Sequence, residues 1–550
     1  MLSRAEALAT VIQQHGPNIY IGIYCKRSID LIIGLLAIGF AGHVYVPLSV
    51  DYSALQISNI IDDAEITLVL IGEGCALDAI TTLAINGSYE QQTSLTITAQ
   101  QRYLSLMYTS GSTGKPKGVK VTHRGIINRL EWMQRNTPLG YSDVVLHKTP
   151  ILFDVSMWEL FWPLITGATI AILPEGDHKD PWQIKRNIIE HGVTTCHFVP
   201  SMLDAFIAEV GLNDLQHLKY VFASGESLSA NLIGRVLAGI PHCQFYNLYG
   251  PTEASIDVSY WECRSPIPKH IPIGRPIDNV RLYVVNQDGQ LVGPNVIGEL
   301  AISGLCLADG YLNRDELTRQ RFISNRFSND EDYQQLYMTG DLVFLNEDWQ
   351  LIFYGRKDHQ IKLNGQRIEL DGIEFLLCQH MHVEQAAVVV QHIDGIAQMV
   401  AFIVGDDCYE ADIRSHMVMH VAASHCPLYY VFVASLPITA TGKLDRKMLI
   451  AHTVIPVLQA VNKPQTETEI ALFNIWVELL NVEQIDCKKS LFEYGVNSLV
   501  LIRALSQIIT HLGVQLKIAD FYKYTSISRL ANYIVDKQVN TKRQVLVEVF

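Results

Sequence analysis

Short apolar segments alternate with longer stretches of helical spacing over the first 300 residues. The segments IYIGIY (19–24), HVYVPL (43–48), ITLVLI (66–71) and ATIAIL (168–173) have the length of buried strands. Between them lie stretches such as 180–191, whose apolar positions recur with the helical period. This alternation predicts layered α/β structure. The longest apolar run, LIIGLLAIGFAG (31–42), suits a buried helix and falls short of the roughly 18 residues that a membrane span needs.

The pattern changes after Gly298. Strand-like pieces separated by turn signals follow one another: GELAISG (298–304), DLVFLNEDWQLIFYG (341–355) and HQIKLNGQRIEL (359–370), in which Asn364 and Gly365 predict a hairpin turn. They indicate a smaller, partly antiparallel α+β unit that begins near Arg356. Residues 453–469 contain two prolines and a polar run, typical of a linker, and 470–537 have helical spacing only, which predicts a small helical bundle.

Composition places limits on partners and compartment. A chain of 550 residues with 49% hydrophobic and 18% charged residues should form several globular domains. The net charge is −14 and no basic stripe is interleaved with aromatic residues, so we expect no nucleic-acid partner. The ten cysteines are scattered singly, which argues against a metal or disulfide framework and favours the reducing cytoplasm. The start of the chain lacks the features of a signal peptide, and we expect no membrane association.

The segment YTSGSTGKPKG (108–118) directly follows the apolar residues LSLM. Small, hydroxylated and glycine residues after a strand can surround phosphate oxygens with N–H and O–H groups, and the lysines add positive charge. The kinase-type phosphate loop is excluded, because the sixth position counted from Gly111 is Pro116. A solvated loop is the alternative for this segment taken alone. The candidate phosphate-binding residues are Thr109, Ser110, Gly111, Ser112, Thr113, Gly114, Lys115 and Lys117.

This loop resembles the signature loop of the adenylate-forming superfamily, and later segments match that family in order. They are LFDVSMWE (152–159), NLYGPTE (247–253), GELAISG, YMTGDL (337–342), GRKDHQIKLNGQRIEL (355–370) and PITATGKLD (437–445). Together they look like the adenylation domains of nonribosomal peptide synthetases. The resemblance implies a large α/β adenylation domain (1–357), a small mobile α+β subdomain (358–455), a linker (456–466), an all-α carrier domain (467–538) and a tail (539–550).

The resemblance also implies a role for residues around ATP. Asp341 would accept the ribose hydroxyls, Arg356, Asn247, Tyr249 and Gly250 would contact the nucleotide, and Thr252 would lie beside the phosphates. Glu253 would position Mg²⁺, which prefers carboxylate and phosphate oxygens. Lys443 would bridge the reacting carboxylate and the α-phosphate, and Asp358 would be the hinge of the small subdomain. Without the family match, a turn-capping role for Asp341, a solvated surface Lys443 and a surface Asp358 would be the ordinary interpretations.

An amino-acid site needs a carboxylate for the ammonium group, because an unpaired charge out of water is costly. In the family that residue is Asp154. The other positions aligned with the substrate site are Val155, Trp158, His197, Phe222, Ser224, Leu248, Ile256, Asp257 and Lys443. Large apolar residues narrow the site and His197, Ser224 and Asp257 add hydrogen-bonding groups, so we expect a small hydroxylated substrate. The set resembles the one that the family associates with L-serine; threonine is the alternative, and His197 by itself would be an ordinary core histidine.

The segment SLFEYGVNSLVLIRAL (490–505) is similar to the carrier-protein motif. Ser498 would carry 4'-phosphopantetheine, although a serine before an apolar helix is more commonly an N-cap. Where the family usually has Gly-Gly-His/Asp-Ser, this chain has Gly-Val-Asn-Ser. The implied partners are a phosphopantetheinyl transferase, downstream synthetase or tailoring enzymes and an MbtH-like activator.

Two other functions compete with this one. An acyl-CoA or acyl-ACP ligase would use similar motifs, but a fatty acid has no ammonium group to pair with Asp154. A non-catalytic scaffold that presents a carrier is the second alternative, because LSRAEALA (2–9) resembles an early family motif that usually follows some tens of residues, so the adenylation domain is expected to be shortened at its start. The nucleotide, magnesium and hinge residues are all present, which favours an enzyme.

Overall fold

The computed structural model describes the chain except residues 16–19, 79, 90–101, 112–115, 359, 364, 394–395, 439–443, 453–461, 481, 483–484, 489–490, 495, 497, 515, 517–519, 522–523 and 548–550. Its contacts divide the chain into two units. The first comprises Met1–Glu175, Lys185–Leu376 and Ser415–His425, and the second comprises Gly176–Ile184, Leu377–Arg414 and Cys426–Phe550. Each unit is described by itself.

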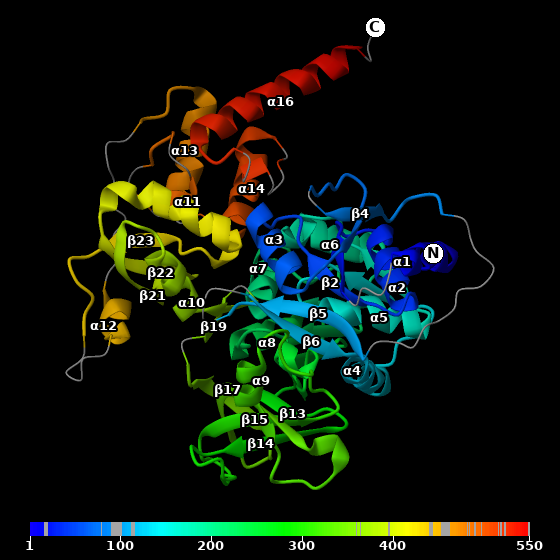
Figure 1. Ribbon diagram of the computed structural model, residues 1–550. Coiled ribbons are helices and arrows are strands. Elements are labelled where there is room, and N and C mark those ends of the chain that lie inside the picture. The colour runs from blue at the N-terminus through cyan, green and yellow to red at the C-terminus, as the bar shows by residue number, and fades with distance from the viewer. Residues whose placement is uncertain are drawn as a thin grey trace. The chain divides into compact units, whose positions relative to one another are not determined.

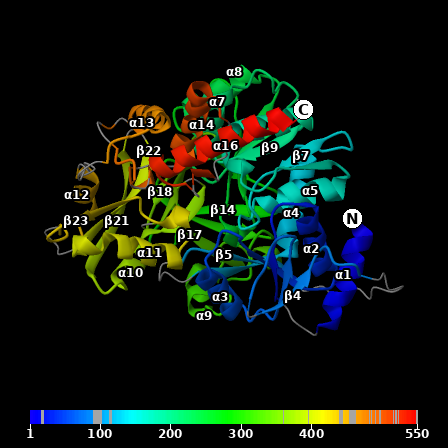
Figure 2. The ribbon, with the colours of Figure 1, turned by 90° about the horizontal axis from the view of Figure 1, so that it is seen from above.

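The first unit opens with a six-stranded sheet in the order β4-β3-β1-β2-β5-β6. Its strands run parallel except β6, which pairs antiparallel with β5. The strands are β1 (Tyr20–Tyr24), β2 (Val44–Leu48), β3 (Leu68–Ile71), β4 (Thr81–Ala84), β5 (Tyr103–Thr109) and β6 (Lys117–Thr122). Helix α1 (Leu2–Gln14) precedes β1, and α2 (Ile29–Phe40) and α3 (Ala54–Asp63) lie between the strands in the chain. Helix α1 packs along α2 (Figure 2, blue). The three apolar segments before residue 72 are therefore strands, and the apolar run 31–42 is a buried helix, as predicted.

A twelve-stranded sheet follows in the chain. Its earlier strands, β7 to β11, pair in parallel, and its later strands pair antiparallel. The order is β14-β15-β17-β18-β13-β12-β11-β10-β9-β7-β8, with β16 beside β17; Figure 1 labels β13, β14, β15 and β17 of this sheet. The parallel strands are β7 (Val144–His147), β8 (Thr169–Ile172), β9 (Thr195–Phe198), β10 (Tyr220–Ala223) and β11 (Gln244–Tyr249). The helices of this region are α4 (His123–Asn136), α5 (Ser156–Thr166), α6 (Pro181–Glu190), α7 (Pro200–Val210) and α8 (Ala230–Gly239). Ligands of open parallel sheets bind at the carboxyl ends of such strands, so the residues after β9, β10 and β11 are the place to look for a site.

The antiparallel part of this sheet contains the strands predicted after Gly298. Its strands are β12 (Ser259–Glu262), β13 (Pro272–Pro276), β14 (Val280–Val285), β15 (Gly298–Gly304), β16 (Phe322–Ser324), β17 (Gln335–Leu345) and β18 (Leu351–Arg356), and α9 (Asp315–Arg321) precedes β16. A hairpin of β19 (Gln360–Leu363) and β20 (Gln366–Glu369) then leads into α10 (Leu370–Cys378). The hairpin confirms the turn that the sequence predicted there.

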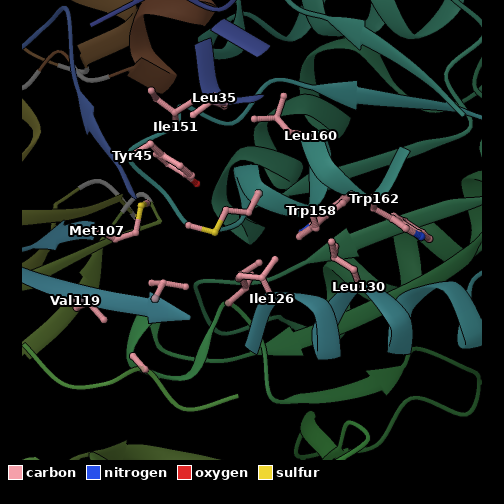
Figure 3. Packing of buried hydrophobic residues seen from close by; sticks show 14 of the residues in the cluster. Leu35, Tyr45, Met107, Val119, Ile126, Leu130, Ile151, Trp158, Leu160 and Trp162 are labelled. Atoms are coloured by element: carbon pink, nitrogen blue, oxygen red, sulfur yellow. The ribbon is translucent and has the colours of Figure 1, made fainter. Parts of the chain in front are cut away.

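A continuous apolar core joins the two sheets of the first unit. It includes Trp158 and Trp162 of α5, both without measurable exposure. Figure 3 shows Ile126 and Leu130 of α4 facing these two tryptophans, with Tyr45 and Met107 to one side. Helix α4 thus turns one face toward the core at positions 126, 130 and 133, the spacing of an amphipathic helix.

The second unit contains a three-stranded sheet and a group of helices. The sheet consists of β21 (Val383–Ile393), β22 (Ile396–Gly405) and β23 (Tyr429–Phe432), with α12 (Arg446–Ala451) against β21. Helix α11 (Glu410–His420) lies between β22 and β23 in the chain, and the boundary between the two units falls within it, after Arg414. The carrier region has α13 (Glu467–Leu480), α14 (Ser498–Leu512) and α16 (Ile527–Val547), which share a core around Trp476, Leu501 and Leu530. The described part of 462–547 holds no strand, which confirms the predicted helical bundle. In the described residues, no helix combines the length and apolarity needed to cross a bilayer.

Candidate functional site

The segment 247–257, NLYGPTEASID, contributes a residue to each of three groups of polar side chains, around Asp341, Glu253 and Asp154. It leaves β11 at Tyr249, turns through a short 3-10 helix (Thr252–Ala254) and returns at Asp257. Gly250 makes this turn possible, because a Cβ there would lie 2.2 Å from the Ile256 carbonyl oxygen. Ile256 has φ of +80°, a conformation that a β-branched residue rarely adopts. Such strained residues cluster at functional sites.

The first group surrounds Asp341, the predicted ribose ligand on β17. Its Oδ1 accepts a hydrogen bond from Arg356 at 2.6 Å, and its Oδ2 accepts one from the Tyr249 hydroxyl. Arg356 also donates to both carboxylate oxygens of Asp358, at 2.6 and 2.7 Å. Although burial opposes it, this pairing lowers the pKa of Asp358. Three predicted residues, Asp341, Arg356 and Tyr249, thus lie in one network with the predicted hinge Asp358.

The second group surrounds Glu253, which has no measurable exposure. Arg367 donates to its Oε2 at 2.7 Å, the Tyr311 hydroxyl donates to its Oε1 at 2.8 Å, and the Lys117 ammonium lies 3.5 Å from Oε1. Burial alone would raise the pKa of Glu253, but Arg367 and then Lys117 hold it well below its usual range. Glu253 is therefore an ionised carboxylate in the protein interior, balanced by two cations.

The glycine-rich segment supplies Lys117 to this group. Thr109 ends β5, and the Ser110 hydroxyl donates to the Arg367 carbonyl oxygen at 2.6 Å. Lys117 begins β6 with its ammonium group 4.9 Å from the centre of the Tyr311 ring. The predicted loop thus starts beside the Glu253 group. Ser112, Thr113, Gly114 and Lys115 lie outside the described residues, and so does Lys443.

The third group surrounds Asp154, the predicted ligand of the substrate ammonium. Burial raises the pKa of Asp154 to about 6, against an opposing hydrogen bond from the Thr252 side chain. A nearby negative charge on Asp257 raises it further. Both Asp154 and Thr252 were predicted site residues, and the structure brings them together. A carboxylate destabilised in this way gains from a cation brought to it.

Two hydrogen-bonded pairs lie in the same region. Asp257 accepts a hydrogen bond from Arg129 at 3.0 Å, and both side chains are buried. His197, at the end of β9, pairs through Nε2 with the Ser224 hydroxyl at 2.9 Å. Burial, and after it the Lys148 charge, lowers the pKa of His197 to about 3, so its imidazole is neutral near pH 7. The three polar residues expected in the substrate site are thus buried, and each has a partner.

Apolar rings and side chains surround these pairs. The Trp158 ring lies 5.4 Å from the Phe222 ring and 6.2 Å from the His197 ring, both in edge contacts. Leu248 and Ile256 are each 2% exposed, and Val155 packs against the same core. All the apolar residues predicted for the substrate site therefore share one buried region with Trp158.

A buried glutamate of this region was not singled out in the sequence. Glu159 of α5 has no measurable exposure, and its Oε2 accepts hydrogen bonds from the Lys148 and Thr149 amides and approaches His147 Nδ1 at 3.0 Å. Its Oε1 accepts from the Thr149 hydroxyl at 2.6 Å. These bonds hold residues 147–149, which lead to Asp154, against α5. A glutamate inside the apolar run MWELFW was the available signal.

Two further predicted residues, Asn247 and Ser498, do not belong to these groups of side chains. The Asn247 amide donates to the Pro272 carbonyl oxygen at 2.7 Å, which ties β11 to β13. Ser498 is the first residue of α14, in the second unit. Arg129, Tyr311 and Arg367 were not predicted to belong to the site. Arg129 could have been suspected, because it is a charged residue among apolar positions on the buried face of α4.

Three protein families match successive parts of the chain. Residues 1–312 match the AMP-binding enzymes, residues 372–443 the AMP-binding enzyme C-terminal domain, and residues 471–534 the phosphopantetheine attachment site. Tyrocidine synthase 3 of Brevibacillus parabrevis is 36% identical over 556 residues, which cover 98% of this chain and 8% of that protein. Zwittermicin A synthase ZmaJ of Bacillus cereus is 37% identical over 471 residues, covering 81% of this chain and 88% of that protein.

A solved structure has the same fold over almost the whole chain. It is holo-PA1221, a nonribosomal peptide synthetase protein containing adenylation and PCP domains, with a TM-score of 0.83, 23% identity, and coverage of 97% of this chain and 91% of that one. The chain spans less than a tenth of the length of tyrocidine synthase 3. The chain belongs to the AMP-binding enzymes and is an adenylate-forming ligase of the nonribosomal peptide synthetase type, with a carrier domain after its adenylation domain.

Proposed function

We propose that the chain activates L-serine with ATP and loads it onto its own carrier domain. In the first step a carboxylate oxygen of serine attacks the α-phosphorus of ATP, and pyrophosphate leaves. In the second step a pantetheine thiolate attached to Ser498 attacks the acyl carbon of seryl-AMP, and AMP leaves, a nucleophilic acyl transfer. One observation supports the choice of substrate: the half-buried Asp154 carboxylate has a raised pKa and lies close enough to the buried Asp257 to be affected by its charge, and the buried His197–Ser224 pair offers further hydrogen-bonding groups.

Each charged group has a task in the first step. Asp154 binds the ammonium of the amino acid, and Lys443 bridges its carboxylate and the α-phosphate. Asp341 receives the ribose hydroxyls, since its two carboxylate oxygens can accept further hydrogen bonds beside those from Tyr249 and Arg356. The Gly-rich segment that ends at Lys117 binds the distal phosphates. Asp358, whose carboxylate is held by Arg356, is the proposed hinge for the second step.

Glu253 is the residue that would hold Mg²⁺. The chemistry fits, because a single ionised carboxylate together with phosphate oxygens is a common magnesium environment. Its carboxylate oxygens are at present paired with Arg367, Lys117 and Tyr311. The metal would neutralise charge on the phosphates of the nucleotide. The Arg367 guanidinium must withdraw from Glu253 before that carboxylate is free to bind a cation.

We therefore expect Arg367→Gln to lower the magnesium concentration that half-saturates pyrophosphate exchange by roughly tenfold, since a charge-assisted hydrogen bond of about 1.5–3 kcal/mol no longer competes. A magnesium titration at fixed ATP measures this. Arg367→Lys retains the competing cation and should stay near the wild-type value. An unchanged midpoint in Arg367→Gln would show that Arg367 does not compete with the metal.

The proposed role of Asp154 predicts a pH dependence. Its pKa is raised to about 6, so the carboxylate is ionised above that pH and protonated below it. Because only the ionised form pairs with an ammonium group, kcat/KM for the amino acid should fall about tenfold per pH unit below pH 6. In Asp154→Asn, kcat/KM should be much lower at every pH, and it should no longer fall below pH 6. A wild-type profile that is flat down to pH 5 would contradict this role.

Two observations argue against the other candidate functions. A fatty acid has no cation for Asp154, which disfavours an acyl-CoA or acyl-ACP ligase. A carrier-presenting scaffold would have no need for buried ionised groups such as Glu253. Threonine keeps the hydroxyl and adds a methyl group, so it is the closest competitor of serine. A phosphopantetheinyl transferase, an MbtH-like activator and downstream enzymes are the proposed protein partners.

Pyrophosphate exchange measured with each common amino acid tests the proposal. We expect serine to support the fastest exchange and alanine to support much slower exchange. A site that hydrogen-bonds a hydroxyl can reject an analogue without it by up to ~10⁴-fold. Exchange that prefers an amino acid without a hydroxyl, or none at all, would overturn the choice of serine.

A further inference from the structure

Arg129 is a buried arginine whose position in the helix is unusual. It follows Ile126 by three residues on the core-facing side of α4, and it has no measurable exposure. Figure 3 shows the neighbouring Leu130 and Ile126 facing Trp158 and Trp162. An arginine does not lose its proton in a protein, so its charge must be balanced where it lies. The counterion is Asp257, with Nη2 to Oδ2 at 3.0 Å.

The pair connects two parts of the chain that are far apart in sequence. Asp257 lies 128 positions after Arg129, at the end of the segment that also carries Thr252 and Glu253. Burial raises the pKa of Asp257, and the Arg129 charge and hydrogen bond oppose that shift. Without the guanidinium, a buried carboxyl group would bind a proton.

Several polar atoms of this region have no partner among the described residues. They are Arg129 Nε and Nη1, Trp158 Nε1 and His197 Nδ1. The Trp132 ring lies 4.8 Å from the guanidinium carbon, but a ring face offers no lone pair. Besides burial and Lys148, the Arg129 charge contributes to the lowered pKa of His197, so the two residues are close enough to interact.

Unsatisfied buried donors are costly, at about 1–3 kcal/mol each, and native proteins contain few of them. A water molecule or a ligand oxygen would satisfy them. Apolar side chains alone cannot satisfy the donors of a buried arginine. The unpartnered donors of Arg129 and Trp158 therefore point to an oxygen atom that this region receives from outside the protein.

We propose, on the basis of the function proposed above, that Arg129 is a positioning residue for substrate selection: it holds Asp257 as an ionised, oriented acceptor for the side-chain hydroxyl of a short hydroxylated amino acid. The hydroxyl donates its proton to Asp257. Its lone pairs accept from the N–H donors around it, because a hydroxyl has one donor and two acceptor sites. An amino acid without the hydroxyl leaves the carboxylate and these donors unpaired.

The His197–Ser224 pair and Asp257 should contribute differently to selection of the hydroxyl. His197 and Ser224 bond to each other, so their polar groups are already partly satisfied. Asp257 has its charge balanced by Arg129 from one side only, through Oδ2. No bond to its Oδ1 is seen among the described residues, which leaves an oxygen for the substrate. Selection against alanine should therefore depend on Arg129, which orients the Asp257 carboxylate.

The test compares four full-length proteins: wild type, Arg129→Lys, Arg129→Met and the double variant Arg129→Met/Asp257→Leu. Pyrophosphate exchange gives kcat/KM for serine and for alanine with each. We expect the wild type to prefer serine by at least ~10²-fold. Arg129→Lys keeps a cation for Asp257 and should retain the preference within about tenfold. Arg129→Met should lose most of it.

If Arg129→Met fails to fold, the serine-to-alanine ratio can still be measured in the double variant. Replacing a buried ion pair with apolar residues of similar volume is often tolerated, whereas removing one partner leaves an uncompensated charge. We expect the double variant to bind ATP, measured by its thermal shift with the nucleotide, and to use alanine at least as well as serine. A purely structural pair would change the melting temperature and leave the serine-to-alanine ratio as in the wild type.

The two proposals fail in different ways. If the wild type does not use serine, the proposed substrate is wrong. If the wild type prefers serine, and a folded variant lacking Arg129 prefers it equally, the role of Arg129 is wrong. A serine-to-alanine ratio that collapses in Arg129→Met and in the double variant, and persists in Arg129→Lys, would support the role of Arg129.

Discussion

Lys443→Ala is expected to lower the rate of adenylate formation by roughly 10²-fold or more, with little effect on the affinity for ATP. Negative charge shifts between the substrate carboxylate and the α-phosphate in the transition state, and a positioned cation stabilises it more than it stabilises the bound substrates. A loss of one such partner costs on this scale in other enzymes. Pyrophosphate exchange under saturating substrates measures the rate.

A matched control lies four residues further along. Lys447 is exposed on α12, so Lys447→Ala removes a lysine from the same region without removing a proposed site residue. It should exchange pyrophosphate at the wild-type rate. Equal rates in Lys443→Ala and Lys447→Ala would remove Lys443 from the mechanism.

Ser498→Ala is expected to abolish loading of the carrier while leaving adenylate formation intact. The alanine has no hydroxyl to form the phosphodiester bond with pantetheine, so no thiol is available for the second step. After incubation with a phosphopantetheinyl transferase and coenzyme A, the intact mass of the variant should stay that of the unmodified chain. Its amino-acid-dependent pyrophosphate exchange should match the wild type.

The same helix offers a control for this variant. Thr510 is an exposed hydroxyl residue of α14, twelve positions after Ser498. Thr510→Ala should be modified and loaded like the wild type. Modification that persists in Ser498→Ala would show that the arm is attached to another residue.

The strands and the helical bundle could be predicted because their signals are local. The segments 19–24, 43–48, 66–71 and 298–304 each form a strand or most of one, and 31–42 forms most of α2. An apolar segment of strand length, or an apolar stripe with the helical period, depends only on neighbouring residues. The hairpin at Gly365 follows from turn chemistry in the same way.

The ionic pairs of the site could not be predicted, because their partners are distant in the chain. Arg367 and Glu253 are 114 positions apart, and Arg129 and Asp257 are 128 positions apart. The family resemblance supplied the roles of Glu253 and Asp257 but not their partners. Only tertiary contacts determine which cation faces a buried carboxylate, and no local pattern encodes them.

The expected boundary at Asp358 differs from the boundary between the two units. The sequence suggests that a mobile subdomain begins at Asp358, yet the hairpin after Asp358 belongs to the first unit, whose boundary falls after Leu376. Arg367, in that hairpin, reaches Glu253. The hinge at Asp358 therefore stays a prediction.

The most direct test is the intact mass of the pantetheinylated full-length chain after incubation with ATP, magnesium and serine. We expect the mass to rise by that of one seryl group, the rise to require ATP, and the added mass to be released by a thiol reagent that cleaves thioesters. Alanine should give little or no rise under the same conditions. A chain that carries the pantetheine arm but gains no mass with serine and ATP would contradict the proposed activity.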